Sequence, residues 1–316
     1  MKIVVPDYYP QFVCIMDRCV HSCCIGWEID IDEDSLARYR TIGGKLGEKL
    51  QACIACEEEG AHFRLGAGER CPFLTENGLC ELILERGEGC LCQICADHPR
   101  YRNFFSDREE IGLGLCCEAA GALILKREDK TKLITLEDDG DACEPDEYEQ
   151  ELLDLRSELT AMLQDRSMTL AQRLAEICSY VQLPLPEIDI AWRNFLLSLE
   201  RLDEAWTQNL RMMECASPSF PVGAEWETAF EQLGVYLLHR HVPGALDDGD
   251  LRGRIAFCLL VLQLLQALCC AMLQMDTGFG IDGLVELARM YSAEIEYSDE
   301  NINAILYELH RRYPEI

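Results

Sequence analysis

Cysteine is the residue type in this chain with the most chemical potential, because its thiolate binds metals and attacks electrophiles. The chain has 19 cysteines among 316 residues, and 13 of them precede residue 120. Most of these 13 fall into four closely spaced groups: Cys14-x4-Cys19-x3-Cys23-Cys24, Cys71-x8-Cys80, Cys90-x-Cys92-x2-Cys95 and Cys116-Cys117. Cysteines that merely fill a core have no reason to gather in this way. The grouping therefore predicts a metal site in the first part of the chain.

The cellular compartment helps to separate metal binding from disulfide formation. The N-terminal stretch MKIVVPDYYPQF has one lysine and lacks the apolar run of about 7–15 residues found in a secretory signal. We therefore expect a cytoplasmic protein, whose thiols stay reduced. An odd number of cysteines also argues against complete disulfide pairing. Zinc or an iron–sulfur cluster is favoured, and disulfides or unliganded thiols are the alternatives.

The spacing of the cysteines favours an iron–sulfur cluster over zinc. Cys92-x2-Cys95 fits a zinc knuckle and Cys53-x2-Cys56 could form another, but the other groups do not repeat as in a zinc ribbon. An iron–sulfur cluster tolerates irregular spacing, because its corners can be reached from different loops. The C-x3-C-x2-C signature of radical S-adenosylmethionine enzymes is absent, since Gly26 stands at its third position. His21 and His98 are weaker ligand candidates.

The formal net charge of −29 restricts the possible partners. Nucleic acid and anionic membrane surfaces would be repelled, whereas a lysine-bearing protein would be attracted. The alternative is simply a soluble acidic protein. Residues 137–151 contain nine acidic residues and no basic one, together with Gly140 and Pro145. This composition predicts a cysteine-rich domain over 1–136, an acidic linker over 137–147 and a helical domain over 148–316.

The pattern of apolar residues predicts a mainly α protein, in which a metal-binding N-terminal domain with short strands precedes an α-helical bundle. Strand-like alternation at 27–32 is followed by a helix that Asp32 or Asp34 could cap, and IGGKLGEKL at 42–50 reads as a turn. Residues 111–125 suit a short strand that delivers Cys116 and Cys117 to a helix, and 126–136 end in a strand. Helices are then expected at 146–165, 168–182, 188–214, 224–241, 250–275, 282–294 and 299–312.

One predicted helix raises the question of a membrane span. Residues 255–275 carry no charge, and a helix of this length could cross a bilayer. They also include Gln263, Gln266 and Gln274 in an acidic protein. We therefore expect a central buried helix of the bundle, with its cysteines in the core, and no membrane association.

Several stretches taken together resemble a known family, the flagellin lysine-N-methylases, which carry a cysteine-rich zinc- or iron-chelating domain. The first matching positions are Phe12, Cys14, Cys19, Cys23, Cys24, Gly26, Trp27, Ile29, Ile31 and Asp32. The next are Cys71-Pro72-Phe73-Leu74, Gly78-Leu79-Cys80, Gly87, Glu88, Leu91, Cys95, Pro99 and Arg100. Residues 115–121 match a later motif, and Tyr236 to His241 with Asp248-Gly249-Asp250 resemble a tract in the family's helical half.

The chain departs from the family pattern at three positions. Cys117 stands where the family usually has proline, Gly121 where arginine is expected, and His98 where tyrosine is more usual. The matching cysteines are intact, so the resemblance implies that Cys19, Cys23, Cys24, Cys71, Cys80, Cys95 and Cys116 are the metal ligands. Cys14, Cys90, Cys92 and Cys117 are held in reserve, and the remaining cysteines are predicted to be structural.

The resemblance implies transfer of a methyl group from S-adenosylmethionine to lysine side chains of a protein, with flagellin as the family's named substrate. A lysine amine must be neutral to attack, although its reference pKa is about 10.4. Asp30, Asp32, Tyr101 and Glu110 are the candidates to position the lysine and receive its proton. Trp27 and Arg100 are the predicted contacts of the cofactor. The alternative for each of these six is an ordinary surface or structural role.

The way in which the methyl donor binds is left open by the sequence. The chain lacks the glycine-rich loop and the alternating strand–helix pattern of the common doubly wound methyltransferases. A [4Fe–4S] cluster could ligate the donor directly, or the cysteine domain could shape a site shared with the helical half. Two other functions are also open: a non-enzymatic zinc- or iron-chelating module that binds a protein partner, and an iron–sulfur electron-transfer protein.

Overall fold

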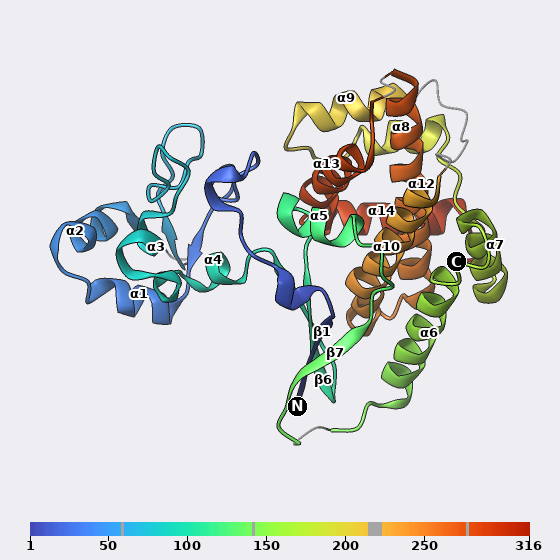
Figure 1. Ribbon diagram of the computed structural model, residues 1–316, viewed down its shortest axis with the longest axis horizontal. Helices are drawn as coiled ribbons and strands as arrows, with labels where there is room; N and C mark the ends of the chain where they lie inside the picture. The colour runs from blue at the N-terminus through green and yellow to red at the C-terminus, as the bar shows by residue number, and fades with distance from the viewer. Residues whose placement is uncertain (58–59, 141–142, 214–222, 276–277) are drawn as a thin grey trace. The chain divides into compact units, whose positions relative to one another are not determined.

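The computed structural model describes residues 1–57, 60–140, 143–213, 223–275 and 278–316. The described residues form two compact units, which Figure 1 traces along the chain. We call residues 13–100 the cysteine-rich unit, and residues 1–12 with 101–316 the helical unit. Helices dominate the structure, so the prediction of a mainly α protein is confirmed.

The cysteine-rich unit is assembled from short elements. Its antiparallel sheet has the strand order β2-β4-β3, formed by Asp30–Ile31, Gly60–Phe63 and Ile54–Glu57. Its helices are α1 (Glu33–Arg40), α2 (Gly44–Cys53), α3 (Glu81–Arg86) and α4 (Gln93–Asp97). As predicted, Asp32 caps α1, because its carboxylate accepts a hydrogen bond from the Ser35 amide at 2.8 Å.

Helix α2 corrects the sequence analysis, which expected only a turn at residues 42–50. Gly44 does adopt the positive φ of a turn residue, 71°, but the chain then continues as a helix. Leu46 and Leu50 are four residues apart and both are buried in the core of this unit. Their burial on one face outweighs the low helix propensity of the glycines.

The helical unit begins with a four-stranded sheet of order β5-β6-β1-β7. Strand β1 (Lys2–Pro6) lies between β6 (Arg108–Leu113), to which it is parallel, and β7 (Leu133–Asp138), to which it is antiparallel (Figure 1). Strand β5 (Arg100–Phe104) pairs with β6 and forms one edge of the sheet. Helix α5 (Glu118–Leu125) joins the same hydrophobic core as the later helices. The compact units therefore differ from the predicted division into 1–136, 137–147 and 148–316, because residues 101–136 pack with the helices.

The remaining helices follow the predicted pattern closely. They are α6 (Glu147–Leu163), α7 (Leu170–Val181), α8 (Ile190–Leu196), α9 (Glu204–Met212), α10 (Ala224–His241), α11 (Ala245–Asp248), α12 (Leu251–Met275), α13 (Ile281–Tyr291) and α14 (Asp299–Arg312), with a π-helical turn η6 (Ser292–Glu296) after α13. The predicted helix 188–214 is two helices, and its last residue lies outside the described residues. It breaks because the Glu294 carboxylate accepts from the amides of Leu202 and Asp203.

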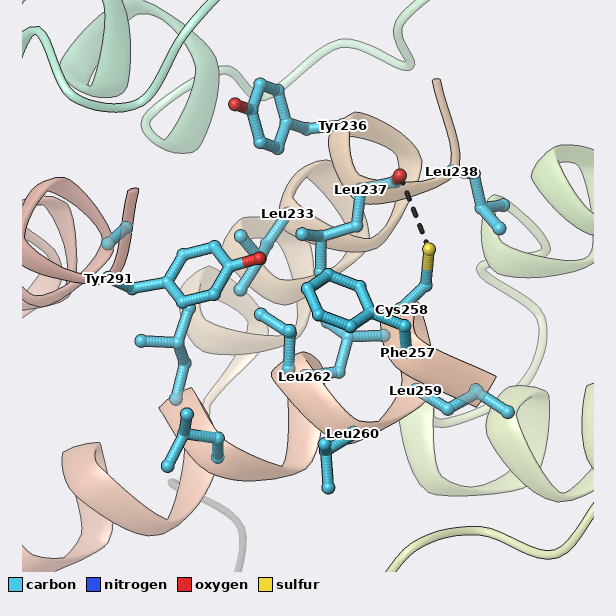
Figure 2. Packing of buried hydrophobic residues seen from close by; sticks show 14 of the residues in the cluster. Leu233, Tyr236, Leu237, Leu238, Phe257, Cys258, Leu259, Leu260, Leu262 and Tyr291 are labelled. Carbon is cyan, nitrogen blue, oxygen red and sulfur yellow. Dashed lines mark hydrogen bonds between the residues drawn. The ribbon is translucent and has the colours of Figure 1, made fainter. Parts of the chain in front are cut away.

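Helix α12 is the one helix in the described ranges that is long and apolar enough to cross a membrane. Of its most apolar window, 83% is buried inside the protein, which agrees with the prediction of a core helix. Figure 2 shows leucines of α10 and α12 packed together beside Phe257 and Tyr291. The Cys258 thiol donates to the carbonyl of Leu237 at 3.3 Å, so this cysteine is structural, as expected.

Helix α10 carries a buried carboxylate, and this makes a first prediction. Glu231 has no exposed side-chain surface, and its oxygens accept from Arg166 and Arg173 at 2.9 Å. We expect Glu231→Gln to lower the free energy of unfolding by about 3 kcal/mol, because buried Arg173 would keep only its pairing with the partly exposed Glu227, at 3.1 Å, and the substituted side chain would stay buried between two arginines. Urea denaturation measures this. The matched control is Glu204→Gln in an exposed pair, which should change stability by less than about 0.5 kcal/mol; equal effects of the two variants would refute the prediction.

Candidate functional site

Seven cysteines lie in or against the core of the cysteine-rich unit, and six of them, all except Cys53, come from the closely spaced groups of the sequence. We call these six the thiol cluster: Cys24, Cys71, Cys80, Cys90, Cys92 and Cys95. Three of them, Cys71, Cys90 and Cys92, are buried and the others are partly buried. Cys95 lies close enough to Cys24, Cys71 and Cys92 for their charges to act on it. Segments far apart in the sequence thus place these cysteines around one core.

Backbone hydrogen bonds hold these segments in place. The amide of Cys71 donates to the carbonyl of Cys24 at 2.9 Å. Tyr39 donates its hydroxyl proton to the carbonyl of Cys90 at 2.8 Å. The second carboxylate oxygen of Asp32 accepts from the Gln93 amide at 2.8 Å and so ties α4 to the start of α1. The thiol cluster is therefore positioned by local structure and not by disulfides, since every cysteine in the described residues is a free thiol.

The thiols of the cluster differ in how readily they ionise. The hydrogen bond from Cys95 lowers the pKa of the Cys92 thiol to about 7, and it raises the pKa of Cys95. A hydrogen bond from Cys23 likewise lowers the pKa of Cys24 to about 7. Burial raises the pKa of Cys71 to about 11. At neutral pH Cys24 and Cys92 are therefore partly thiolate, which is the form that binds metal.

The donor chemistry of the thiol cluster fits zinc or an iron–sulfur cluster, because both take soft sulfur ligands from separate loops. Its six sulfurs exceed the four that one such group requires. Across the described ranges, no three side chains of His, Cys, Asp or Glu stand together as a metal site.

The structure places most of the predicted metal ligands in the cysteine-rich unit and one in the helical unit. Cys24, Cys71, Cys80 and Cys95 are in the thiol cluster, as are the reserve residues Cys90 and Cys92. Cys19 and Cys23 are in the same unit, where the Cys19 thiol donates to the carbonyl of His21 at 3.3 Å and Cys23 is exposed. Cys14 is exposed, and Cys117 is the residue before α5, where its side chain makes no capping hydrogen bond. Cys116 belongs to the helical unit.

Three predicted site residues of the cysteine-rich unit have structural partners. Both carboxylate oxygens of Asp32 accept backbone hydrogen bonds. The Trp27 indole donates to the carbonyl of Cys23, and its ring lies 6.0 Å from the His98 ring. Arg100 donates to the carbonyl of Ala96 at 3.2 Å. The fourth, Asp30, is exposed on β2, and its carboxylate is open to solvent.

The helical unit contains a cavity of about 420 Å³, which we call the Arg240 pocket. Its lining includes Arg102, Phe104, Arg240, His241, Asp247, Glu296, Asp299 and Ile302. Glu296 is buried and accepts from the Tyr236 hydroxyl and from Nε2 of His241, both at 2.8 Å. The His241 ring in turn lies 3.3 Å from the Tyr291 hydroxyl. A buried carboxylate at the edge of the pocket is thus hydrogen-bonded by a tyrosine and a histidine.

Tyr101 and Glu110, the other two predicted catalytic residues, lie in the helical unit. Burial raises the pKa of Tyr101, so its phenol is neutral at physiological pH. The ring stands against β6 at Gly112, where an added Cβ would come within 2.1 Å of it. Glu110 is buried and paired with Arg156 at 2.6 Å. The carboxylate of Glu110 is therefore committed to a structural ion pair, whereas the Tyr101 ring contacts a residue of the pocket.

The residue of the pocket that the Tyr101 ring contacts is Arg240. Its guanidinium lies 4.4 Å from the centre of the Tyr101 ring and 5.6 Å from the centre of the Tyr297 ring. The predicted ligand Cys116 is next to Tyr297, whose hydroxyl hydrogen-bonds to its thiol, and burial raises the pKa of Cys116 to about 12. Cys116 is therefore protonated in the absence of metal.

Comparison with known proteins gives this geometry a context. The chain is 25% identical over 142 residues to the Flagellar biosynthetic protein FliU of Salmonella muenchen. The aligned stretch covers 42% of this chain and 82% of that protein. It is 25% identical over 139 residues to a Lysine-N-methylase of Salmonella typhimurium and to one of Salmonella choleraesuis. The resemblance to the flagellin lysine-N-methylases is confirmed.

The extent of the match is limited. The aligned stretch covers 42% of this chain and 35% of each lysine-N-methylase, so the chain matches about a third of the length of those relatives. No model of a protein family matches the chain, and no solved structure does.

Sequence reasoning missed the residues that line the Arg240 pocket. One signal pointed toward them, because the tract from Tyr236 to His241 resembles part of the lysine-N-methylase family's helical half and contains Arg240. Glu296 gave no signal, since it is the last residue of a π-helical turn that periodicity does not predict.

The half-buried His98 ring gives a pH prediction. Burial, with a smaller effect of the Arg100 charge, lowers the pKa of His98 to about 4. Below about pH 6.5 the unfolded chain binds a proton that the folded chain does not accept until about pH 4. The free energy of unfolding should therefore fall over this window on acidification, by at most roughly 3 kcal/mol.

Urea denaturation of the wild type and of His98→Phe at pH 7 and pH 4.5 tests this. Phenylalanine keeps a ring beside Trp27 but cannot bind a proton, so the variant should lose less stability on acidification. The same loss in both proteins would contradict the assignment.

Proposed function

We propose that this protein is a lysine N-methylase that transfers a methyl group from S-adenosylmethionine to lysine side chains of a flagellin-type protein. The observation that carries the proposal is the similarity to proteins named Lysine-N-methylase, together with the match to FliU. The net charge of −29 supports a lysine-bearing substrate, because opposite charge favours the encounter. A cytoplasmic location without nucleic-acid or membrane partners is part of the proposal.

In the proposed reaction the lysine nitrogen forms a bond to the methyl carbon while the bond from that carbon to the sulfonium sulfur breaks. The products are methyllysine, S-adenosylhomocysteine and one proton, which the amine has to give up. Among the predicted residues, Asp30 has an exposed carboxylate that can accept this proton. Tyr101 is a neutral phenol and can hydrogen-bond to an amine without taking its proton. The carboxylates of Asp32 and Glu110 have structural partners.

We assign the thiol cluster to the bound metal, either a [4Fe–4S] cluster or zinc. When bound, a [4Fe–4S] cluster would supply an iron able to take further ligands, and zinc would supply a fixed scaffold. The partly ionised Cys24 and Cys92 are suited to be the first ligands, with Cys71, Cys80 and Cys95 beside them. The side chains of Trp27 and Arg100, which the resemblance suggests as contacts of the cofactor, donate to the carbonyls of Cys23 and Ala96.

A second candidate function rests on the position of the thiol cluster within one compact unit. A self-contained sulfur site is also what a non-enzymatic zinc- or iron-chelating module or an iron–sulfur electron-transfer protein needs. Methylase activity requires binding of S-adenosylmethionine, whereas electron transfer requires a reversible cluster potential and a chelating module requires neither.

The methylase proposal predicts methyl transfer in vitro. The anaerobically purified protein, incubated with S-adenosylmethionine and a flagellin, should add methyl groups to flagellin lysines, as detected by mass spectrometry of peptides. Flagellin whose lysines are acetylated beforehand is the control and should gain none. Absence of transfer to flagellin and to other lysine-rich proteins, with cofactor and metal present, would reject the proposal.

The assignment of the metal predicts which cysteines matter. Iron, zinc and acid-labile sulfide are measured after anaerobic purification; a [4Fe–4S] protein is brown with about four irons, and a zinc protein is colourless. Cys24→Ser and Cys92→Ser should each lose at least about half of the bound metal, because a ligand is removed. Cys178→Ser in α7 is the matched control and should keep it. Equal metal contents in all four proteins would place the metal elsewhere.

A further inference from the structure

Arg240, near the C-terminal end of α10, has an unusual set of partners. Its guanidinium is held beside the rings of Tyr101 and Tyr297, at 4.4 Å and 5.6 Å from their centres. Within the described parts of the chain, no hydrogen bond or ion pair to this guanidinium is found. Arg240 is partly buried, and a partly buried arginine normally uses some of its five N–H donors on a carboxylate or carbonyl. These donors are therefore available to a ligand.

The nearby carboxylate does not use these donors. Glu296 is buried in the same region, and its charge offsets that of Arg240 across space. Its oxygens, however, accept from Tyr236 and His241 at 2.8 Å. The charge of Glu296 thus stabilises the Arg240 cation from nearby, although the two side chains form no direct ion pair.

The other arginines of the Arg240 pocket are already paired. Arg102 forms an ion pair with Glu109, and Arg254 pairs with Asp248 at 2.6 Å. Arg240 is therefore the cation of this lining whose donors are not spent on the described residues. The pocket volume of about 420 Å³ is in the range of small-molecule sites.

We propose that the Arg240 pocket binds the methyl donor, with the guanidinium of Arg240 holding the carboxylate of the donor's methionine moiety through two hydrogen bonds. This inference rests on the proposed function. The Arg240 guanidinium, which has no ion-pair partner among the described residues, repels the ammonium of a substrate lysine and attracts a carboxylate. It therefore favours binding of the methyl donor over binding of the lysine.

Other groups of the lining complement the rest of such a molecule. Asp247 and Asp299 are exposed carboxylates that suit the donor's ammonium group. Phe104 is 66% exposed and presents an aromatic face, on which an adenine ring can stack or a sulfonium can rest. An amino acid joined to an aromatic group by a cationic sulfur matches this set of groups.

The test compares S-adenosylmethionine with its decarboxylated analogue, by calorimetry on the full chain. The wild type should bind the carboxylated donor about 10- to 100-fold more tightly than the analogue, as expected for a charged pair with two hydrogen bonds. Arg240→Met should weaken binding of the donor by a similar factor and change binding of the analogue by less than about 3-fold. The preference for the carboxylate then disappears.

Three further variants make the outcome specific. Arg240→Lys keeps the charge but lacks the planar pair of donors, so it should keep only part of the preference. It also serves if Arg240→Met does not fold. Arg211→Met removes one exposed charge of the same unit and should keep the full preference. If Arg100→Met abolishes the preference and Arg240→Met does not, the carboxylate is bound at Arg100 and the inference is wrong.

The two proposals fail in distinguishable ways. Binding and methyl transfer with a carboxylate preference that Arg240→Met leaves intact would overturn the pocket assignment alone. If the wild type does not bind S-adenosylmethionine at all, the proposed function fails together with it. Inorganic phosphate is the remaining probe: if it binds the wild type more tightly than the donor does, and Arg240→Met abolishes only phosphate binding, the pocket is a phosphate site and the inference is overturned.

Discussion

The packing of the helical unit depends on the partners that other elements supply to the charged and polar side chains of α10. Glu231 faces two arginines, one of them from the buried face of α7. Nine residues later, Arg240 meets two aromatic rings, and the next residue, His241, meets Glu296 of η6. A buried charge costs several kcal/mol unless it has a partner. The elements that supply these partners are therefore fixed against α10, and with them the arrangement of the sheet and the later helices.

A different constraint applies to the cysteine-rich unit. Its helices are short, and its core combines a few large side chains, such as Phe63 and Phe73, with several thiols. A small unit buries a small share of its surface and gains little from packing alone. Metal binding would add free energy of folding, because the unfolded chain does not present the ligands together. The thiol cluster can therefore serve the fold and the chemistry at once.

Sequence periodicity predicted the elements that are governed by local rules. The helix at 224–241 was predicted with the observed bounds, and the cap at Asp32 was predicted correctly, because both follow from spacing and side-chain chemistry within one segment. The compact units were not predicted, since β1 pairs with strands more than a hundred residues away. The break between α8 and α9 was also missed, because Glu294 comes from another part of the chain.

The candidate sites divide along the same line. Four residues of the thiol cluster, Cys24, Cys71, Cys80 and Cys95, are among the predicted ligands, whereas Cys90 and Cys92 were held in reserve. The sequence could not anticipate that the pKa of Cys92 is lowered, because this depends on a hydrogen bond from Cys95. The sequence does not predict the role of Arg240, because its place beside two tyrosines arises only when β5 and the end of η6 pack against α10. An arginine paired with a carboxylate uses its N–H donors to stabilise the fold. An arginine held by aromatic rings keeps its charge and its N–H donors for a ligand, and for this reason the Arg240 pocket is suited to bind one.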